Sequence, residues 1–577
     1  MNNIGVELWE PRVVIAFFLI VCIGIFSTSA VGKLPAVTVN PNSTSEVITP
    51  EQFGAKGDGV ADDTSAVKKA LKQAGMNGTV QGNGVYKLKS LLGYVEAKRA
   101  GAGKFKFEDA EWPFATTSSG EKQQADFPDK TIVADTRYSH FPNFARYKNL
   151  VVGAYNSTLS HGQANIEAIV QRQKMTKAGS FFLNGNMANG EKVKLNAATK
   201  LNITVTTDES HRDFIIKGTK NGVPSEIKVR GPKKGTLTTT LADKLDAISS
   251  VETDGSTSGP VSIGLDFVPG NVEVKFSTNS GRNFSRPIVV GDGMSEGKYL
   301  YYSSSLGVSN DGMFVVVYNR LGIDNAERSS LRRASRDGRL WSEPEKIRYG
   351  KSQSAKTLAM YGEIKTTPSG RFVMLPYSGT ENWAFVSAAG DYGRNWTPHL
   401  IVDSKNSKPD VNYSEMGLAI ISESTWLAVA RVDGRVDSFR QFLTLDAGKT
   451  WKNVGSVNIP PSGGYVSPQI AVIDANNQKE MYLFFMVRKS VSAPSPYGNK
   501  LVVIKRNVSE PLNSNTKNVK WNNKITVIDS NLEMRSGYPS IIFNEQAQDF
   551  FVFYGKEYSL FKADVQGKKQ RISDIAN

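Results

Sequence analysis

Cysteine and histidine are nearly absent from this chain of 577 residues. The one cysteine, Cys22, has no partner for an internal disulfide and cannot form a thiolate metal site with other cysteines. The four histidines, His140, His161, His211 and His399, show no spacing typical of metal ligands. We therefore expect no metal and no other cofactor.

Long blocks of lysine and arginine are also missing, and no nucleic-acid-binding motif stands out. The chain nevertheless carries 70 Lys and Arg against 55 Asp and Glu, a net charge of +15. A positive charge spread over a surface favours polyanionic partners. Because the charge is not concentrated in blocks, we expect an acidic polysaccharide as the partner, and no nucleic acid.

A hydrophobic run occupies residues 13–26, and a short Ser/Thr/Ala segment follows it as far as Ala30. Residues 1–30 are interpreted as a signal peptide cleaved after Ala30, with an N-terminal anchor as the alternative. Residues 31–47 are rich in Pro, Asn, Ser and Thr and are interpreted as a linker.

One turn motif occurs four times in the second half of the chain. It has Asp or Asn, then Gly within two residues, then an aromatic residue three positions after the Gly. The glycines Gly281, Gly338, Gly393 and Gly448 are 57, 55 and 55 residues apart. The Asx side chain can bond nearby amides, the Gly supplies a positive φ, and the aromatic residue can pack between sheets. A fixed period of this length is typical of the blades of a β-propeller.

The rest of the pattern predicts an all-β fold with several modules. Residues 266–577 show strand and turn signals throughout, whereas residues 175–265 are Thr-rich with short strands and are interpreted as an inserted small β-domain. Residues 130–174 are assigned to the first part of propeller blade one. Residues 48–129 are assigned to a small N-terminal capping module, because their opening Phe-Gly-Ala-Lys-Gly-Asp-Gly run resembles the start of phage tailspike and pectate-lyase-like domains.

Four residues in the second half of the chain form a candidate site. Glu415 precedes Arg431 by sixteen residues, across a predicted strand, turn and strand. Arg488 ends an apolar strand, and Tyr538 follows in a Ser-Gly-Tyr-Pro run. This order of Glu, Arg, Arg and Tyr resembles the sialidase superfamily of six-bladed propellers. The resemblance covers roughly residues 130–565 apart from the insertion, and it implies six blades here.

The resemblance also implies roles for these side chains. Arg431 and Arg488 would bind the carboxylate on the anomeric carbon of a sialic acid, because guanidinium groups bind carboxylates bidentately and stay charged. Tyr538 would be the nucleophile, as in sialidases and unlike most glycosidases. Glu415 would take the tyrosine proton or stabilise charge.

Two histidines mark departures from exo-acting sialidases. His140, in a Ser-His-Phe-Pro run, stands where the resemblance expects the first arginine of a Phe-Arg-Ile-Pro motif, and we assign it to substrate binding. His161, in a Ser-His-Gly run, stands in the region of the usual acid/base aspartate and matches a histidine of phage endosialidases. It would orient or protonate the leaving group. Arg320 and Arg535 are interpreted as further substrate contacts.

The cap and the interrupted propeller are most similar to those of the phage endosialidases, which are tailspike-type depolymerases of polysialic acid capsules. The resemblance predicts a glycosidase that cleaves sialosyl linkages within an acidic polysaccharide. The alternatives are an exo-sialidase that uses Tyr538 and Glu415, a non-catalytic glycan-binding propeller such as an adhesin or virion receptor-binding protein, and specificity for another nonulosonic acid. The resemblance also implies an acidic polysaccharide or sialoglycan as the substrate, a homotrimer, and association with a virion, whereas the hydrophobic N-terminal run indicates a secreted protein.

Overall fold

The computed structural model describes most of the chain from residue 47 to residue 576. Within this span it leaves out residues 76–77, 90–96, 107–110, 114–128, 135–136, 159–167, 186–187, 189–192, 195–199, 206, 234–236, 242–244, 266–269, 294–298, 323–327, 351–357, 379, 404–410, 434–437, 458–463, 476–477, 489–498, 508–510, 523, 531, 534–535 and 560–561. The predicted signal peptide or anchor and nearly all of the linker lie outside the described residues. Across the described ranges, no helix is long and apolar enough to cross a membrane.

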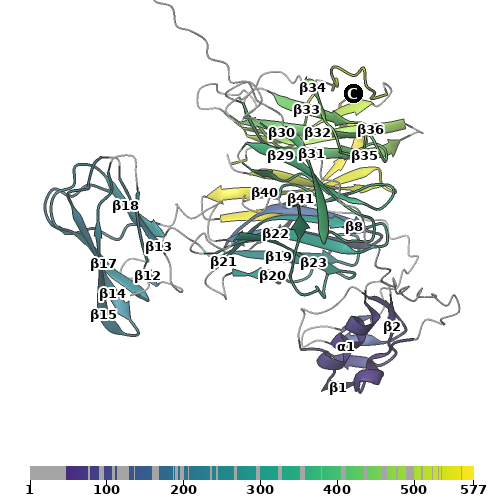
Figure 1. Cartoon of the computed structure of the whole chain (residues 1–577), viewed down its shortest axis with the longest axis horizontal. Coiled ribbons are helices and arrows are strands. Elements are labelled where there is room, and N and C mark those ends of the chain that lie inside the picture. The colour runs from purple at the N-terminus through teal and green to yellow at the C-terminus, as the bar shows by residue number, and fades with distance from the viewer. Residues whose placement is uncertain are drawn as a thin grey trace, which may run out of the picture. The chain divides into compact units, whose positions relative to one another are not determined.

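Residues 48–129 contain short strands and α1, the one α-helix that the described ranges contain in full (Figure 1). The elements are η1 (Pro50–Phe53), β1 (Asp58–Asp62), α1 (Thr64–Ala74), β2 (Thr79–Gln81), β3 (Val85–Lys87), β4 (Lys98–Ala100), β5 (Lys104–Lys106) and β6 (Glu111–Pro113). Val67 and Leu71 lie one turn apart on α1, and both are buried against a core that includes Tyr86 and Phe105. The strands form one sheet in the order β1-β3-β5-β6 and a pair β2-β4.

From residue 130 onward, apart from the insertion, antiparallel sheets follow one another along the chain (Figure 1). The first three are β8 (Tyr138–Tyr147), β9 (Leu150–Thr158), β19 (Asn271–Ser277) and β20 (Ile288–Asp292); β21 (Tyr299–Val308), β22 (Phe314–Gly322), β23 (Arg328–Ser335) and β24 (Glu345–Lys346); and β26 (Lys365–Thr366), β27 (Phe372–Met374), β29 (Glu381–Ser387) and β30 (Asn395–Asp403), with β25 (Arg348–Tyr349) and β28 (Tyr377–Ser378) added. The next three are β31 (Asn412–Ile420), β32 (Trp426–Asp433), β33 (Phe439–Thr444) and β34 (Lys452–Val457); β35 (Gly464–Ala475), β36 (Gln478–Arg488), β37 (Lys500–Asn507) and β38 (Thr526–Asp529); and β39 (Gly537–Asn544), β40 (Asp549–Ser559), β41 (Lys562–Arg571) and β7 (Lys130–Val133), with η3 (Ile572–Asp574) after β41.

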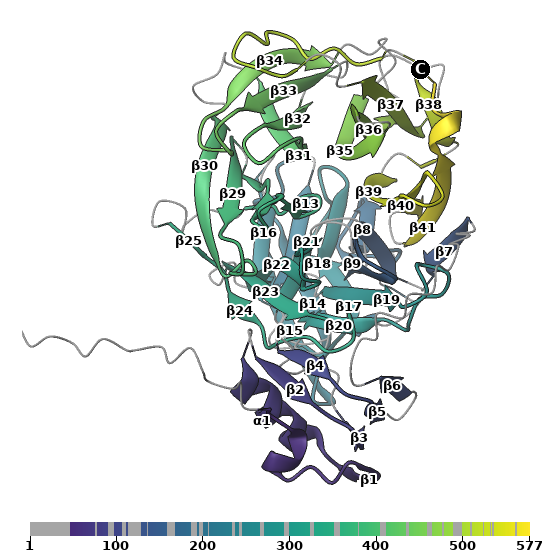
Figure 2. The ribbon, with the colours of Figure 1, turned by 90° about the vertical axis from the view of Figure 1, so that its right-hand side faces the viewer.

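The first strands of these sheets, β8, β21, β26, β31, β35 and β39, are called the inner strands. Each inner strand contacts the next one along the chain, and β39 contacts β8, so that the contacts form a cycle. Figure 2 shows the inner strands that it labels towards the centre, and the fourth strands β20, β24, β34 and β38 towards the periphery. A parallel pairing of Tyr138 with Ala563 also joins the first and last sheets. Side chains at corresponding positions of the inner strands therefore converge.

Neighbouring sheets pack face to face, as β36 shows. Leu483 and Phe485 belong to a core shared with β32 and β33, whereas Phe484 and Met486 belong to a core shared with β39 and β40. Because successive side chains of a strand point to opposite faces, a strand buried on both faces needs an unbroken apolar run. The sequence Met-Tyr-Leu-Phe-Phe-Met-Val of β36 has this pattern.

The four repeated turns join the third strand of a sheet to the fourth strand, and their predicted chemistry is confirmed. In the fourth turn, the Asp446 carboxylate accepts the amide of Thr450 at 2.9 Å. Gly448 has φ +86°, and the indole of Trp451 donates to its carbonyl at 2.9 Å. Thr444 adds a contact that the motif did not predict, because its hydroxyl accepts the Gly448 amide at 3.0 Å.

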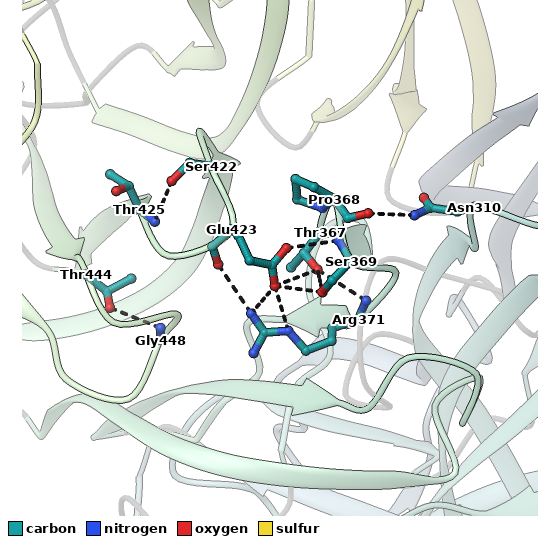
Figure 3. A network of polar contacts seen from close by, with 10 residues as sticks. All are labelled: Asn310, Thr367, Pro368, Ser369, Arg371, Ser422, Glu423, Thr425, Thr444 and Gly448. Carbon is teal, nitrogen blue, oxygen red and sulfur yellow. Dashed lines mark hydrogen bonds and ion pairs between the residues drawn. The ribbon is translucent and has the colours of Figure 1, made fainter.

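The loops between first and second strands also bond from one sheet to the next (Figure 3). The side chain of Asn310, after β21, donates to the carbonyl of Pro368, after β26, at 3.1 Å. Glu423, after β31, accepts the amide of Ser369 at 2.9 Å and the guanidinium of Arg371 at 3.0 Å. These bonds fix the second, third and fourth sheets to one another at the ends of their strands.

Gly448→Ala is expected to lower the melting temperature much more than Gly390→Ala. Both glycines have positive φ, which costs an alanine about 1 kcal/mol or more. A Cβ on Gly448 would lie 2.4 Å from the ring of Trp426, whereas a Cβ on Gly390 meets nothing within 4 Å. Overpacking of this kind costs a further ~1–3 kcal/mol. Thermal unfolding followed by circular dichroism measures both variants, and equal shifts would contradict the packing argument.

The insertion lies between β9 and β19, which pair directly with each other from Asn271–Ser157 to Ser277–Val151. Its strands are β10 (Ala168–Gln173), β11 (Gly179–Ser180), β12 (Val193–Lys194), β13 (Lys200–Val205), β14 (Asp213–Lys220), β15 (Val223–Arg230), β16 (Leu237–Leu241), β17 (Ala247–Thr253) and β18 (Val261–Leu265). They form the sheets β10-β18-β13-β16 and β11-β17-β14-β15, which share one core. Because β10 pairs with β18, the predicted boundary at residue 175 lies after the first strand of this module.

Candidate active site

Five of the inner strands carry a β-bulge close to one end. The bulged pairs are Phe141-Pro142, Ser303-Ser304, Ser414-Glu415, Ser467-Pro468 and Tyr538-Pro539. A bulge breaks the alternation of side chains and re-aims them, which is why bulges occur beside active sites. The first residue of four of these pairs has φ between +56° and +58°, a conformation that L-residues rarely adopt. In the remaining inner segment Gly362 has φ +72°.

The bulges surround a cavity of about 250 Å³. Its wall is made largely of aromatic and small polar side chains, and the residues that line it are His140, Phe141, Pro142, Asn143, Asn156, Thr158, Leu300, Tyr302, Ser303, Ser304, Ala359, Met360, Tyr361, Gly362, Tyr377, Glu415, Gln469, Tyr538 and Pro539. Glu415 carries the single carboxylate of this lining. The cavity thus joins two of the predicted catalytic residues, Glu415 and Tyr538, and the predicted binding residue His140.

Glu415 is held in place on both of its carboxylate oxygens. Its side chain is only 5% exposed, and Oε1 lies 3.1 Å from Nη1 of Arg431. Oε2 accepts the amide of Ser467 at 3.0 Å. Glu415 and Tyr538 line the same cavity, and the negative charge of Glu415 raises the pKa of the Tyr538 phenol. A buried carboxylate needs such partners to remain ionised, and an ionised carboxylate beside a phenol is suited to take its proton.

Tyr538 reaches the cavity from the bulge in β39, where the backbone of Gly537 packs closely against the side chain of Met486. Gly537 has φ +131°, and a Cβ there would lie 2.4 Å from Cγ of Met486. The Tyr538 ring meets His140 and Phe141 edge to face at centroid distances of 5.1 and 4.3 Å. Burial raises the pKa of Tyr538, and the negative charge of Glu415 raises it further, so that the phenol stays protonated at neutral pH.

Arg431 lies between two carboxylates. Besides Glu415, it binds Asp433, with 3.1 Å between Nε and Oδ1. Asp433 also accepts the hydroxyl of Ser414 at 2.9 Å. Burial raises the pKa of Asp433, although Arg431 lowers it. The sequence analysis did not identify Asp433, but its position two residues after Arg431 places both side chains on one face of β32.

Arg488 ends β36 beside this group. Met486 of this strand packs against Gly537, the residue before Tyr538, and the positive charge of Arg488 lowers the pKa of Tyr538. Among the described residues, its Nε and Nη2 atoms are buried and have no hydrogen-bond partner. Buried guanidinium nitrogens without partners are costly, so this arginine is well suited to receive an anionic ligand.

His140 is fully buried and lines the cavity. Its ring stacks on Tyr138 at 5.2 Å and lies against Gly555, where a Cβ would come within 2.5 Å of the ring. The neighbouring strand therefore fixes the position of this histidine. It contributes a ring to the wall at the place where the resemblance expects an arginine.

Arg431 binds Glu415, and Arg488 acts on Tyr538, but neither arginine is part of the cavity lining. The other predicted site residues are not brought to this cavity. Arg320 stacks on the ring of Tyr299 at 4.6 Å and is not part of the cavity lining. His161 and Arg535 lie outside the described residues. Within the described ranges, no group of three His, Cys, Asp or Glu side chains is placed to hold a metal ion.

A pattern in the sequence marks three of the bulges, and the search for motifs did not use it. Three of them read Phe-Pro-Asn, Ser-Pro-Gln and Tyr-Pro-Ser, beginning at Phe141, Ser467 and Tyr538. Proline cannot donate to a sheet ladder and is therefore found at edges and bulges. A repeated Pro followed by a polar residue at the start of a predicted strand would have located the cavity.

Comparisons with solved structures find weak likenesses. A protein of unknown function from Dyadobacter fermentans is 11% identical, covers 77% of this chain and 98% of that chain, and has a TM-score of 0.46. The NanB sialidase from Streptococcus pneumoniae is 10% identical over 70% and 100% of the two chains, with a TM-score of 0.40. A Trypanosoma rangeli sialidase is 10% identical over 75% and 55%, with a TM-score of 0.41. By sequence, the chain matches no protein-family model and no curated protein.

Proposed function

We propose that the sheets formed by residues 130–571 are the blades of a six-bladed β-propeller, and that the protein is a glycosidase acting on a sialic-acid-type sugar. The cycle of inner-strand contacts supports the propeller. The observation that carries the function is the group at the cavity: Tyr538 and Glu415 line it together, and Glu415 is bound to Arg431. The likeness to solved sialidases is too weak to add to this argument.

The proposed reaction has two steps. The Tyr538 oxygen attacks the anomeric carbon while the bond from that carbon to the leaving oxygen breaks, and Glu415 takes the phenolic proton. His161 would protonate the leaving oxygen. In the second step water attacks the same carbon and gives a proton to His161 while the bond from that carbon to the Tyr538 oxygen breaks. Glu415 returns its proton to the tyrosine oxygen as that bond breaks.

A neutral nucleophile suits a sugar that carries a carboxylate on its anomeric carbon. An anionic nucleophile would be repelled by that carboxylate in a cavity of low dielectric. Tyr538 remains neutral until it attacks, because burial and Glu415 raise its pKa. Arg488, with two nitrogens that lack partners among the described residues, and Arg431 would bind the sugar carboxylate.

The size of the cavity favours action at a chain end. About 250 Å³ lies below the usual range of ~300–1,000 Å³ for ligand pockets. A cavity this small accommodates a terminal sugar better than a continuous polymer. We therefore propose exo action with the Tyr538–Glu415 pair. Endo action on an acidic polysaccharide, which the resemblance implies, remains a prediction.

Sizing the products made from polysialic acid tests the proposal. We expect release of monomer and cleavage of a fluorogenic sialoside. A ladder of oligomers would show endo action instead. Unchanged polymer and unchanged sialoside, at protein concentrations that bind both, would overturn the assignment as a hydrolase.

Binding without cleavage is the second candidate function, and one observation favours it. The cavity lining holds one carboxylate and His140 in place of an expected arginine. Such a site can bind an acidic sugar through Arg431 and Arg488 without completing the reaction. Retention of intact polysialic acid by the protein would identify this outcome in the same experiment.

A further inference from the structure

The hairpin between β40 and β41 presents an aromatic ring to solvent close to the proposed active site. Tyr558, near the end of β40, is 48% exposed, and the other exposed large aromatic residue of the described ranges, Phe182, lies in the insertion. Exposed aromatic rings are enriched at binding surfaces, because they bury a large area with little loss of side-chain entropy. A surface of this kind next to a cavity is therefore a candidate ligand-binding surface.

The chain holds the Tyr558 ring in place. Its hydroxyl accepts a hydrogen bond from Nε2 of Gln566 at 3.3 Å, and burial and the carboxylate of Asp564 raise its pKa. Both residues are on β41, the strand that pairs with β40. The ring is therefore positioned by its polar end, while the residue stays 48% exposed.

Two lysines flank this ring. Nζ of Lys556 lies 6.0 Å and Nζ of Lys562 lies 5.5 Å from the ring centroid. The pairing of β40 with β41 is irregular between Glu557 and Ser559, so the positions of the two ammonium groups follow from these distances and not from strand alternation. The carboxylates nearby are largely covered: Glu557 is 5% exposed, Asp564 is 6% exposed, and Asp529, whose side chain is 12% exposed, pairs with Lys568 at 3.0 Å. The exposed charge around the ring is therefore positive. We call Lys556, Tyr558 and Lys562 the hairpin patch.

The hairpin patch lies at the same end of its sheet as the candidate active site. Gly555 pairs with Gly537, the residue before Tyr538. Tyr558 is three residues beyond Gly555, which is about 10 Å along a strand. Figure 2 shows β39, β40 and β41 side by side in this sheet. A sugar chain whose terminal residue occupies the cavity can therefore reach the hairpin patch.

We propose that the hairpin patch is a second binding surface, which holds the following residues of an acidic saccharide chain whose terminal sugar occupies the cavity. The apolar face of a sugar ring packs on Tyr558, and the ammonium groups of Lys556 and Lys562 pair with carboxylates of the chain. The proposal rests on the proposed function for the position of the terminal sugar. It adds the prediction that the ligand is an acidic oligomer rather than a single sugar.

Binding measurements on an inactive background test this surface without requiring turnover. The parent is Tyr538→Phe, and the probes are polysialic acid of defined length, the monosaccharide N-acetylneuraminic acid and neutral dextran. Adding Tyr558→Ala is expected to weaken polysialic acid binding at least tenfold. The factor by which it weakens monosaccharide binding is expected to be at least five times smaller. Lys562→Glu, at an exposed position, is expected to weaken polymer binding at least fivefold and to reduce its dependence on salt.

The control is Phe182→Ala, which removes an aromatic side chain that is 72% exposed in the insertion and should leave polymer affinity unchanged. If Tyr558→Ala and Lys562→Glu both bind polysialic acid like the parent, the proposal is wrong. It is also wrong if dextran binds as tightly as polysialic acid and loses as much affinity in Tyr558→Ala. Polymer binding that depends on Tyr558, in a protein that never cleaves sialosides, would uphold this surface while rejecting the proposed hydrolase.

Discussion

Replacing Tyr538 with phenylalanine is expected to lower the turnover of a fluorogenic sialoside by ~10³-fold or more, because the attacking oxygen is lost. The ring contacts with His140 and Phe141 do not involve the hydroxyl, so the melting temperature should change little. Steady-state kinetics and thermal unfolding measure the two effects on the same preparation.

Tyr361→Phe is the matched control for this variant. Tyr361 lines the same cavity, is close to Glu415 and donates its hydroxyl to the carbonyl of Pro468 at 3.2 Å. Its loss removes a hydrogen bond and leaves the nucleophile in place, so we expect a change in turnover of less than about tenfold. Equal losses in the two variants, or full activity of Tyr538→Phe, would exclude Tyr538 as the nucleophile.

Arg431→Ala is expected to abolish measurable cleavage and also to destabilise the fold. The variant removes a carboxylate-binding group, and truncating one partner of a buried charge pair costs ~2–5 kcal/mol in binding. It also leaves Glu415, whose side chain is 5% exposed, without its cation. An uncompensated buried charge of this kind destabilises a protein by ~3–5 kcal/mol. Turnover and thermal unfolding of the same variant measure the two losses.

Arg371→Ala is the matched control, because it removes an arginine of an ion pair that is not part of the proposed site. Arg371 forms an ion pair with Glu423 in a loop away from the cavity (Figure 3). Because the Glu423 side chain is 44% exposed, the loss of this pair should lower stability by less than ~1 kcal/mol. Cleavage by Arg371→Ala should match that of the unaltered protein. If Arg431→Ala also cleaved sialosides normally, the proposed binding of the sugar carboxylate would be wrong.

The sequence was informative where the chemistry is local. The turn at Gly448 needs an acceptor, a residue with positive φ and an aromatic cover within a few positions, and each has a recognisable residue type. Spacing also placed Glu415 and Arg431 on one strand–turn–strand unit, and the structure joins them there in an ion pair that the sequence analysis did not predict. Local rules therefore predicted the repeated turns.

The sequence was uninformative where position depends on register. Tyr538 enters the cavity because of a bulge, and one slip of pairing would turn its side chain to the other face. The place of Asp433 in the site follows from the pairing of β31 with β32. Its hydrogen-bond partner Ser414 lies on the other strand, nineteen residues away along the chain. Arg320 has the residue type of a substrate contact, but its strand directs it to Tyr299. Residue type alone cannot separate these cases.

The last sheet is completed by a strand from much earlier in the chain, and this determines when the site can exist during synthesis. Thr131 of β7 and Gln566 of β41, 435 residues apart, are joined by a hydrogen bond of 2.9 Å. Contacts over such separations form late, because the loop between them must be closed first. Tyr538 belongs to the same sheet. A growing chain therefore lacks the proposed nucleophile until almost all of it has left the ribosome, and we expect a chain cut short before residue 537 to be inactive.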